Sequence, residues 1–253
     1  MSQLISSHAF ILAAGRGTRL RPYTDYRPKP LVEVGGRSLI DHLIDQLIAA
    51  GIADVHINLH HRGEQLRRHL SARRDIRLHF YDEPELLDTG GGIKQALPYM
   101  DGLPFIAMNG DAFLHDCGVT SALEALMHDW APGNMDMRLL LEPCSQMTLT
   151  GCVGDYTLDD DMRAKLCPDK DGDHMFTGIR LCDPGLFANT PEGAFAFLDL
   201  MQEAEARGRL FGTINPGRWH HISRGADYEA VLEAYGEAEH PPSIPSPLKR
   251  GEG

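Results

Sequence analysis

A basic, glycine-containing segment stands out in an otherwise acidic chain. Residues 12–30 read LAAGRGTRLRPYTDYRPKP, whereas the whole chain of 253 residues has a formal net charge of −12. Gly15 and Gly17 allow the backbone to approach a ligand and to direct successive amides at it. Arginine offers a planar fork to phosphate oxygens and lysine a compact charge, so the mixture predicts a polyphosphate site. The basic side chains are Arg16, Arg19, Arg21, Arg27 and Lys29, against the single acid Asp25.

The segment is neither of two common phosphate-binding motifs. A Walker loop requires G-x-x-x-x-G-K-[ST], and no lysine followed by a hydroxyl residue closes this glycine segment. The dinucleotide fingerprint requires glycine at its sixth position, where this chain has Leu20. A glycine turn with solvated basic side chains is the remaining alternative. The phosphate site is favoured because the basic cluster directly follows a predicted strand, and α/β sheets bind ligands at strand carboxyl ends.

Two further groups point to the same edge. Residues 87–92 (LDTGGG) open a predicted helix, where free amides and the helix dipole favour polar or anionic ligands. A structural helix start is the alternative there. Asn109-Gly110-Asp111 follows an apolar strand, and a carboxylate at that position can hold Mg²⁺ against phosphate oxygens. The alternative for Asp111 is helix capping.

Alternating strands and helices would bring these groups together. We expect one helix to be capped by Ser38 and stopped by Gly51. The alternation predicts an α/β fold with a mainly parallel, Rossmann-like sheet and helices on both faces. The other expected helices are 63–72, 91–97, 119–130, 194–207 and 225–239. The expected strands are 8–13, 54–59, 76–81, 104–108, 135–142, 151–157, 174–181 and 210–214, with 218–222 returning to the sheet.

Composition excludes several classes of protein. The negative charge argues against nonspecific binding to nucleic acid or to an anionic membrane. No run approaches the roughly 18 to 20 apolar residues that span a bilayer, and residues 1–8 lack the regions of a signal peptide, so we expect a cytoplasmic protein. The five cysteines form no C-x-x-C pair. We therefore expect reduced thiols, with neither a disulfide framework nor a structural zinc.

The pattern L-A-A-G-x-G-T-R-L-x-P followed by P-K-P-L-V, intact from Leu12 to Val32, resembles the signature of the sugar-phosphate nucleotidyltransferases. The resemblance extends over about residues 8 to 235. It implies the nucleotide-diphospho-sugar transferase fold and the joining of a nucleoside triphosphate to a sugar 1-phosphate, with release of pyrophosphate. Among compact members, LDTGGG and a short second half most resemble the N-acetylmuramate 1-phosphate uridylyltransferases of cell-wall recycling. The mannose-1-phosphate guanylyltransferases are the alternative.

The resemblance also implies roles for single residues. Arg19, Lys29 and Asp111 would be catalytic, and Asp111 would bind the metal. Thr177 and Gly178 of the segment FTGI would line the sugar site. Glu142 is a further candidate for sugar hydroxyl contacts, with an exposed or capping acid as the alternative. The implied nucleotide-binding residues are Ala13, Ala14, Gly15, Gly17, Thr18, Arg19, Thr89, Gly90, Gly91 and Asn109.

One departure from the family pattern concerns the metal. Related members carry W-x-D-x-G-T near the carboxyl end, where residues 219–224 read WHHISR, so His221 stands in the aspartate's place. Imidazole is a poor ligand for Mg²⁺ and a good one for Zn²⁺, Co²⁺ or Mn²⁺, so we expect Mg²⁺, with Mn²⁺ or Co²⁺ as alternatives. Three interpretations stay open. His221 binds the metal directly or through water, Asp227 replaces it, or His221 packs while Asp111 and the nucleotide phosphates suffice.

The implied reaction is in-line attack by the sugar phosphate on the α-phosphorus of the triphosphate. No general base is required, because the second pKa of a phosphate monoester is roughly 6. We expect one domain over residues 1–239, with a nucleotide-binding half at 8–134 and a sugar-binding half at 135–239, and a disordered tail at 240–253. The expected partners are the two substrates, with no nucleic acid and no membrane, for a monomer or homodimer. A noncatalytic sugar-nucleotide-binding regulatory protein is the alternative from another class.

Overall fold

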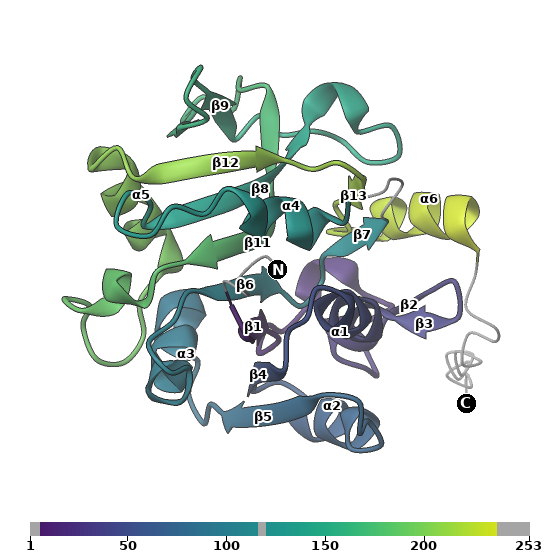
Figure 1. The fold of residues 1–253 in the computed structure, drawn as a ribbon. Coiled ribbons are helices and arrows are strands. Elements are labelled where there is room, and N and C mark those ends of the chain that lie inside the picture. The colour runs from purple at the N-terminus through teal and green to yellow at the C-terminus, as the bar shows by residue number, and fades with distance from the viewer. Residues whose placement is uncertain (1–5, 116–119, 237–253) are drawn as a thin grey trace, which may run out of the picture.

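The computed structural model describes residues 6–115 and 120–236 (Figure 1). Within these residues the main sheet has nine strands, and seven of them follow the order β10-β9-β11-β6-β1-β4-β5. Strand β8 pairs with β11, and β12 pairs with β8. The predicted tail at 240–253 and Cys117 lie outside the described residues, as do the outermost residues of the helices expected at 119–130 and 225–239.

The nucleotide-binding half carries the parallel strands. Strand β1 pairs in parallel with β4 and β6, and β4 pairs in parallel with β5. Helix α1 is capped by Ser38, whose Oγ accepts a hydrogen bond from the amide of Asp41 (3.2 Å). The strands are β1 (His8–Leu12), β4 (Asp54–Leu59), β5 (Arg77–Asp82) and β6 (Phe105–Asn109). The helices are α1 (Leu39–Ala49), α2 (Gly63–Leu70), α3 (Asp88–Ala96) and α4 (Ala122–His128).

The second half adds mostly antiparallel strands. Strand β11 runs antiparallel to both β6 and β8, and β12 returns parallel to β8. Strands β9 and β10 form an antiparallel pair at the sheet end, and β10 is absent from the sequence-based expectations. The strands are β8 (Met137–Pro143), β9 (Tyr156–Leu158), β10 (Ala164–Leu166), β11 (His174–Cys182) and β12 (Leu210–Ile214), and the helices are α5 (Phe197–Ala206) and α6 (Gly225–Tyr235).

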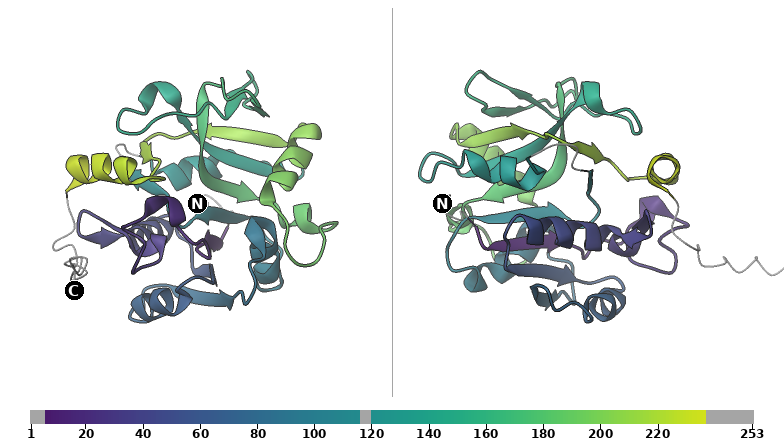
Figure 2. Two further views of the ribbon diagram at one scale, coloured as in Figure 1. Left: turned by 180° about the vertical axis from the view of Figure 1, so that it is seen from behind. Right: turned by 45° about the vertical axis from the view of Figure 1, so that its right-hand side comes forward.

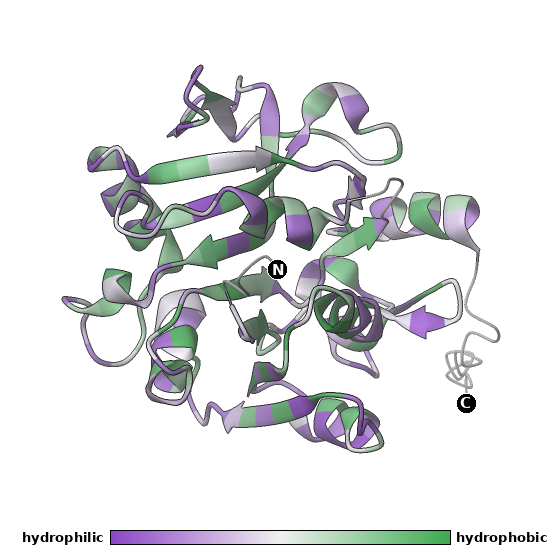
Figure 3. Cartoon of the chain, viewed as in Figure 1, coloured by the Kyte–Doolittle hydropathy of each residue, from purple (hydrophilic) through white to green (hydrophobic). Residues whose placement is uncertain are grey.

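The helices cover both faces of the sheet, as predicted. One apolar core joins α1, α2 and α4 to the sheet, and a second core on the other face holds residues of α3 and α5. Figure 3 shows hydrophobic residues concentrated along the central strands β1 and β6, while the edge strand β5 alternates in character. A third, smaller core holds α6 against β2 (Glu33–Val34), which forms a two-stranded sheet with β3 (Arg37–Ser38) (Figure 2).

Two expectations are corrected. The segment 218–222 does not join the main sheet, because β13 (Arg218–His220) pairs antiparallel with β7 (Phe113–His115) in a separate two-stranded sheet. The expectation of reduced thiols is wrong for two cysteines, since Cys144 and Cys152 form a disulfide. Their Cα atoms lie 5.3 Å apart, within the range that a disulfide spans. Among the described residues, no helix combines the length and apolar character needed to cross a membrane.

Candidate active site

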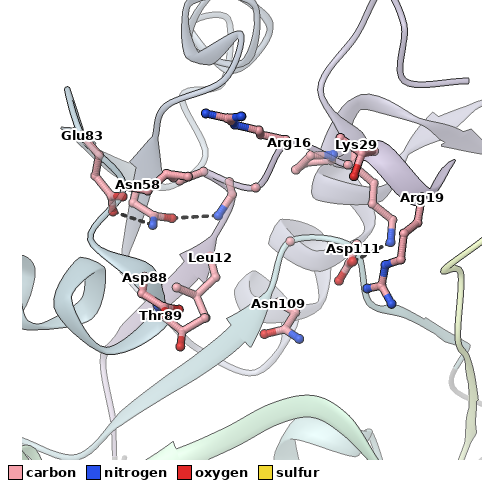
Figure 4. Close-up of a pocket in the computed structure, with 18 of the residues that line it drawn as sticks. Leu12, Arg16, Arg19, Lys29, Asn58, Glu83, Asp88, Thr89, Asn109 and Asp111 are labelled. Atoms are coloured by element: carbon pink, nitrogen blue, oxygen red, sulfur yellow. Dashed lines mark hydrogen bonds and ion pairs between the residues drawn. The ribbon is translucent and has the colours of Figure 1, made fainter. Parts of the chain in front are cut away.

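A cavity of about 630 Å³ opens at the carboxyl ends of β1, β4 and β6 (Figure 4). It lies where the sequence places its phosphate loop, and eight consecutive residues, 13–20, line one wall. The other lining residues are Leu12, Lys29, Pro30, Asn58, Glu83, Leu86, Asp88, Thr89, Asn109, Gly110, Asp111, Ala194 and Ser223. The strand-end rule therefore brings together the three groups that the sequence singles out.

The phosphate loop depends on glycine at one position. Gly17 has φ +61°, and a Cβ there would lie 3.1 Å from the Cβ of Lys29. The Thr24 hydroxyl donates a hydrogen bond to the Gly17 carbonyl (2.8 Å), which holds the turn. A Cβ at Gly15 would meet no protein atom within 4 Å, so the backbone there faces open space. Gly17 thus shapes the loop, and Gly15 leaves room beside it for a ligand.

Lys29 and Asp111 form an ion pair in the cavity wall. The Lys29 Nζ lies 2.6 Å from Asp111 Oδ2, and the lysine side chain is 11% exposed against 37% for the aspartate. Pro28 and Pro30 flank Lys29, which starts a short 3₁₀ turn over Lys29–Leu31. Figure 4 shows Arg19 on the same side of the cavity as this pair. The site therefore sets two cations beside one carboxylate, an arrangement suited to phosphates and a divalent metal.

Asp111 fits a magnesium ion held mainly by its substrate. Among residues 6–115 and 120–236, no group of three or more His, Cys, Asp or Glu side chains is placed to hold a metal. Magnesium commonly binds through one or two carboxylates together with substrate phosphates and water. Lys29 contacts Oδ2 of Asp111, and the carboxylate offers a second oxygen, Oδ1, to a metal.

His221 lies near this carboxylate but does not line the cavity. Burial lowers the pKa of His221, and the charges of Asp111 and Lys29 also act on it, in opposite directions. Its backbone amide donates to Thr150 Oγ1 (3.3 Å). Asp227 Oδ2 accepts the backbone amides of Ser223 and Arg224 (3.1 and 2.8 Å) at the start of α6. The Asp227 carboxylate is therefore engaged in helix capping.

The glycines of the second loop serve packing. Thr89 lines the cavity, whereas Gly90 and Gly91 lie outside its lining. A Cβ on Gly90 would overlap the ring of Phe195, and one on Gly91 would overlap the Gly193 carbonyl oxygen. The Gly90 amide also donates to the Phe195 carbonyl (2.9 Å). These two glycines let the start of α3 press against the segment before α5.

The predicted sugar residues lie on β11, beside the cavity rather than in its lining. Thr177 is 2% exposed, and its hydroxyl donates to the Leu140 carbonyl (2.8 Å). Gly178 has φ +82°, and a Cβ there would lie 2.5 Å from Nδ2 of Asn109, which does line the cavity. Gly178 therefore brings the β11 backbone close to the site.

Glu142 is neither an exposed acid nor a helix cap. Its side chain is fully buried, and its Oε2 accepts a hydrogen bond from Asn215 Nδ2 (2.6 Å). Burial raises the pKa of Glu142, and the hydrogen bond from Asn215 opposes this shift.

Asn58 and Glu83 are among the buried cavity residues that are absent from the predicted site. Asn58 is the penultimate residue of β4, and Glu83 directly follows β5. Both are 3% exposed, and both line the cavity. The signal that could identify them is the strand-end rule already applied to Asp111, because each polar residue stands at the carboxyl end of a predicted strand.

Known proteins are similar to this chain in sequence and in fold. The sequence profile of the family described as nucleotidyl transferase matches residues 8–141. The N-acetylmuramate alpha-1-phosphate uridylyltransferase of Caulobacter vibrioides is 35% identical over 236 residues, which cover 89% of this chain and 94% of that protein. A mannose-1-phosphate guanyltransferase of Gibberella zeae is 40% identical over 106 residues, which cover 40% of this chain and 29% of that protein.

The fold also matches solved structures. A UDP-glucose pyrophosphorylase complexed with UDP-glucose superposes with a TM-score of 0.73 at 15% identity, covering 91% of this chain and 98% of that one. At this identity the likeness concerns the fold alone. It agrees with the nine-stranded sheet and its two helical layers.

Proposed function

The chain belongs to the nucleotidyl transferase family, and we propose that it transfers the uridylyl group of UTP to N-acetylmuramate 1-phosphate, releasing pyrophosphate. The reaction class is that of a sugar-1-phosphate nucleotidyltransferase. The observation that carries the proposal is the Lys29–Asp111 ion pair, 2.6 Å between Nζ and Oδ2, in the cavity that the phosphate loop lines. The choice of substrates rests on the relative that matches along nearly its whole length.

The protein's task in this reaction is to align two polyanions and to offset their charge. The amides of residues 13–19 and the Arg19 side chain would hold the triphosphate. Lys29 would leave Asp111 for the α-phosphate and stabilise the charge that develops on it. The Pro28 and Pro30 rings flanking Lys29 restrict the backbone from which its side chain would reach the reacting phosphate.

Asp111 would hold a divalent cation, for which we propose Mg²⁺ with Mn²⁺ or Co²⁺ as alternatives. Held by Asp111, such a cation would supply positive charge to stabilise the phosphates during the transfer. The sugar phosphate would approach from the β11 side, where Gly178 brings the backbone against the Asn109 side chain that lines the cavity. The attacking phosphate oxygen is already ionised near neutral pH, so no side chain has to remove a proton.

Two alternatives are weaker. The mannose-1-phosphate guanyltransferase match covers 40% of this chain and 29% of that protein. The noncatalytic regulatory protein was suggested by His221 in place of aspartate. That suggestion loses its basis, because Asp111 together with substrate phosphates is a sufficient ligand set for Mg²⁺.

We propose one nucleotidyltransferase domain with its nucleotide-binding half at 8–134 and its sugar-binding half from 135. We further propose a cytoplasmic monomer or homodimer without nucleic-acid or membrane partners. Size-exclusion chromatography with light scattering measures the oligomeric state.

A matrix of substrates tests the proposed reaction. UTP, GTP, CTP and dTTP are each combined with the 1-phosphates of N-acetylmuramate, N-acetylglucosamine, mannose and glucose, and pyrophosphate release is measured with Mg²⁺, Mn²⁺ and Co²⁺. We expect the highest kcat/KM for UTP with N-acetylmuramate 1-phosphate. A preference for GTP with mannose 1-phosphate would replace the proposal, and binding without turnover under every metal would revive the regulatory alternative.

A further inference from the structure

A buried chain of hydrogen bonds crosses the floor of the nucleotide cavity. The backbone amide of Ala13 donates to Asn58 Oδ1 (2.7 Å), and Asn58 Nδ2 donates to Glu83 Oε1 (2.7 Å). The second oxygen of this carboxylate, Oε2, accepts the backbone amide of Leu87 (3.0 Å). These hydrogen bonds connect the first residue of the phosphate loop to the loop that precedes α3, and Figure 4 shows the two that involve Asn58.

The packing around the pair leaves it little freedom. Asn58 and Glu83 are each 3% exposed. A Cβ on Gly92 would lie 2.7 Å from Glu83 Oε1 and 2.8 Å from Asn58 Nδ2, so a larger residue in α3 would displace both groups. The backbone of Glu83 is fixed as well, because its amide donates to the Leu59 carbonyl (2.8 Å) and its carbonyl contacts His60 Nδ1 (2.7 Å).

Hydrogen bonds within the protein engage the side-chain polar atoms of both Asn58 and Glu83. Both carboxylate oxygens of Glu83 accept hydrogen bonds from the protein. Asn58 accepts one hydrogen bond at Oδ1 and donates one from Nδ2. A buried group that loses its partner carries a large desolvation penalty, so the loss of one of the three hydrogen bonds weakens the others. Their effect is to fix the separation between the two walls of the cavity.

We propose that Asn58 and Glu83 are positioning residues that set the spacing between the phosphate loop and the loop before α3, and thereby the affinity for the triphosphate. The pair acts through Ala13 on one wall and through Leu86, Asp88 and Thr89 on the other, all of which line the cavity. The inference rests on the proposed function only in assigning a triphosphate to this cavity, and it holds for any nucleobase.

The chemistry of the pair permits a swap of its two groups. In Asn58→Asp, two carboxylates face each other and the donor between them is lost. In Glu83→Gln, the side-chain amide accepts at one oxygen only, so either Asn58 or the Leu87 amide loses its acceptor. In the double variant Asn58→Asp/Glu83→Gln, the new carboxylate at position 58 accepts from Ala13 and from the new glutamine amide, whose oxygen accepts from Leu87. All three hydrogen bonds are restored, and the net charge of −12 is unchanged.

The test measures KM for each substrate, kcat and Tm in both single variants and in the double variant. The triphosphate used is the one that the wild-type protein turns over fastest, so a different nucleobase preference would sink the proposed function and leave this test intact. We expect each single substitution to raise KM for the triphosphate by about tenfold or more, with KM for the sugar phosphate changed less than about twofold. The double variant should return to within about threefold of wild type.

Matched control variants show whether an effect comes from the location of the substitution or from the change in charge alone. Glu85→Gln and Asn134→Asp make the same chemical changes at exposed residues outside the cavity lining, and both should keep wild-type KM values. Should a single variant fail to fold, the double variant decides alone. The proposal is overturned if the double variant folds with wild-type Tm but keeps a raised KM for the triphosphate. A parallel rise of both KM values that tracks the loss of Tm would equally overturn it.

Discussion

The two residues of the Lys29–Asp111 ion pair have different proposed roles, Lys29 at the α-phosphate and Asp111 at the divalent cation. Replacing Lys29 by alanine removes the cation proposed to act at the α-phosphate, and we expect kcat to fall by roughly 10²- to 10³-fold. The fold should tolerate the change, since the Asp111 side chain left behind is 37% exposed and remains hydrated. Steady-state kinetics and Tm measure both effects. Lys165→Ala, at an exposed lysine of β10, is the matched control, and a Lys29→Ala variant with wild-type turnover would refute the assignment.

His221 offers a second test at the scale of one residue. His221 stands where the family pattern has an aspartate, and the charges of Asp111 and Lys29 both act on its imidazole. An aspartate there would add a hard oxygen ligand, so His221→Asp should lower the Mg²⁺ concentration for half-maximal velocity by about threefold or more. A magnesium titration of the rate measures this, with His128→Asp as a remote control. An unchanged titration would mean that His221 only packs.

The sequence predicts the position of some cavity residues, while the contacts of others depend on tertiary packing. Gly17, Lys29 and Asp111 are predictable because a strand end, a reversal of charge and a family pattern coincide there. Gly90 and Gly91 look the same in sequence whether the missing side chain makes room for a ligand or for a packing neighbour. The structure shows that they make room for Phe195 and Gly193, and their contact with a nucleotide stays a prediction. The Asn58–Glu83 contact requires the knowledge that β4 and β5 are neighbours, which no local pattern contains.

At the scale of elements, the loop between β8 and β9 and the strand β13 support each other. Gln146 Oε1 accepts a hydrogen bond from Arg218 Nη1 (2.6 Å), and Thr150 Oγ1 accepts the His221 amide (3.3 Å). The Cys144–Cys152 disulfide closes this same loop. A spacing of eight residues between two cysteines does not predict their pairing, and β13 is too short for its partner to be read from periodicity. The sequence therefore misses both features.

The disulfide makes a direct prediction about thiols and stability. Under denaturing conditions, the unreduced protein should show two fewer reactive thiols than the reduced protein. Closing so short a loop stabilises a fold by about 2 to 3 kcal/mol in the chain-entropy account, so a reductant should lower Tm by roughly 5 °C or more. The double variant Cys144→Ser/Cys152→Ser serves as the control, because its Tm should not respond to the reductant. Five reactive thiols in the unreduced protein would contradict the pairing.

At the scale of the whole molecule, the fold class follows from the sequence because alternating strands and helices leave few arrangements. Strands β1, β4, β5 and β6, with the helices between them, lie within a few residues of the predicted ranges. The second half is less predictable, since its strands pair antiparallel over long separations and their order is set by tertiary packing. One example is β11, which sits between β6 and β8 and joins the two halves.

Two buried histidines should make the stability of this fold depend on pH. His56 on β4 is fully buried, between His8 Nδ1 (3.1 Å from its Nε2) and the Tyr81 hydroxyl (2.8 Å from its Nδ1), and it stacks on His79. Burial lowers the pKa of His56 to about 4. Burial likewise lowers the pKa of His220 to about 4. Both imidazoles are therefore neutral in the folded protein at about pH 6, where part of the unfolded population binds a proton.

The stability of the protein should consequently fall as the pH decreases from about 6.5 to about 4. A histidine whose pKa is depressed by folding contributes fully above its unfolded value near 6.5. That contribution is lost as the pH drops toward the folded value. Folding raises the pKa of His69, which pairs with Asp41, and of the buried Glu142. These shifts change the stability in the opposite direction, and they are smaller than those of His56 and His220. Urea unfolding at half-unit steps between about pH 7.5 and 4.5 measures the slope, and His56→Gln, which cannot titrate, should reduce it. A slope that this substitution leaves unchanged would place the acid sensitivity elsewhere.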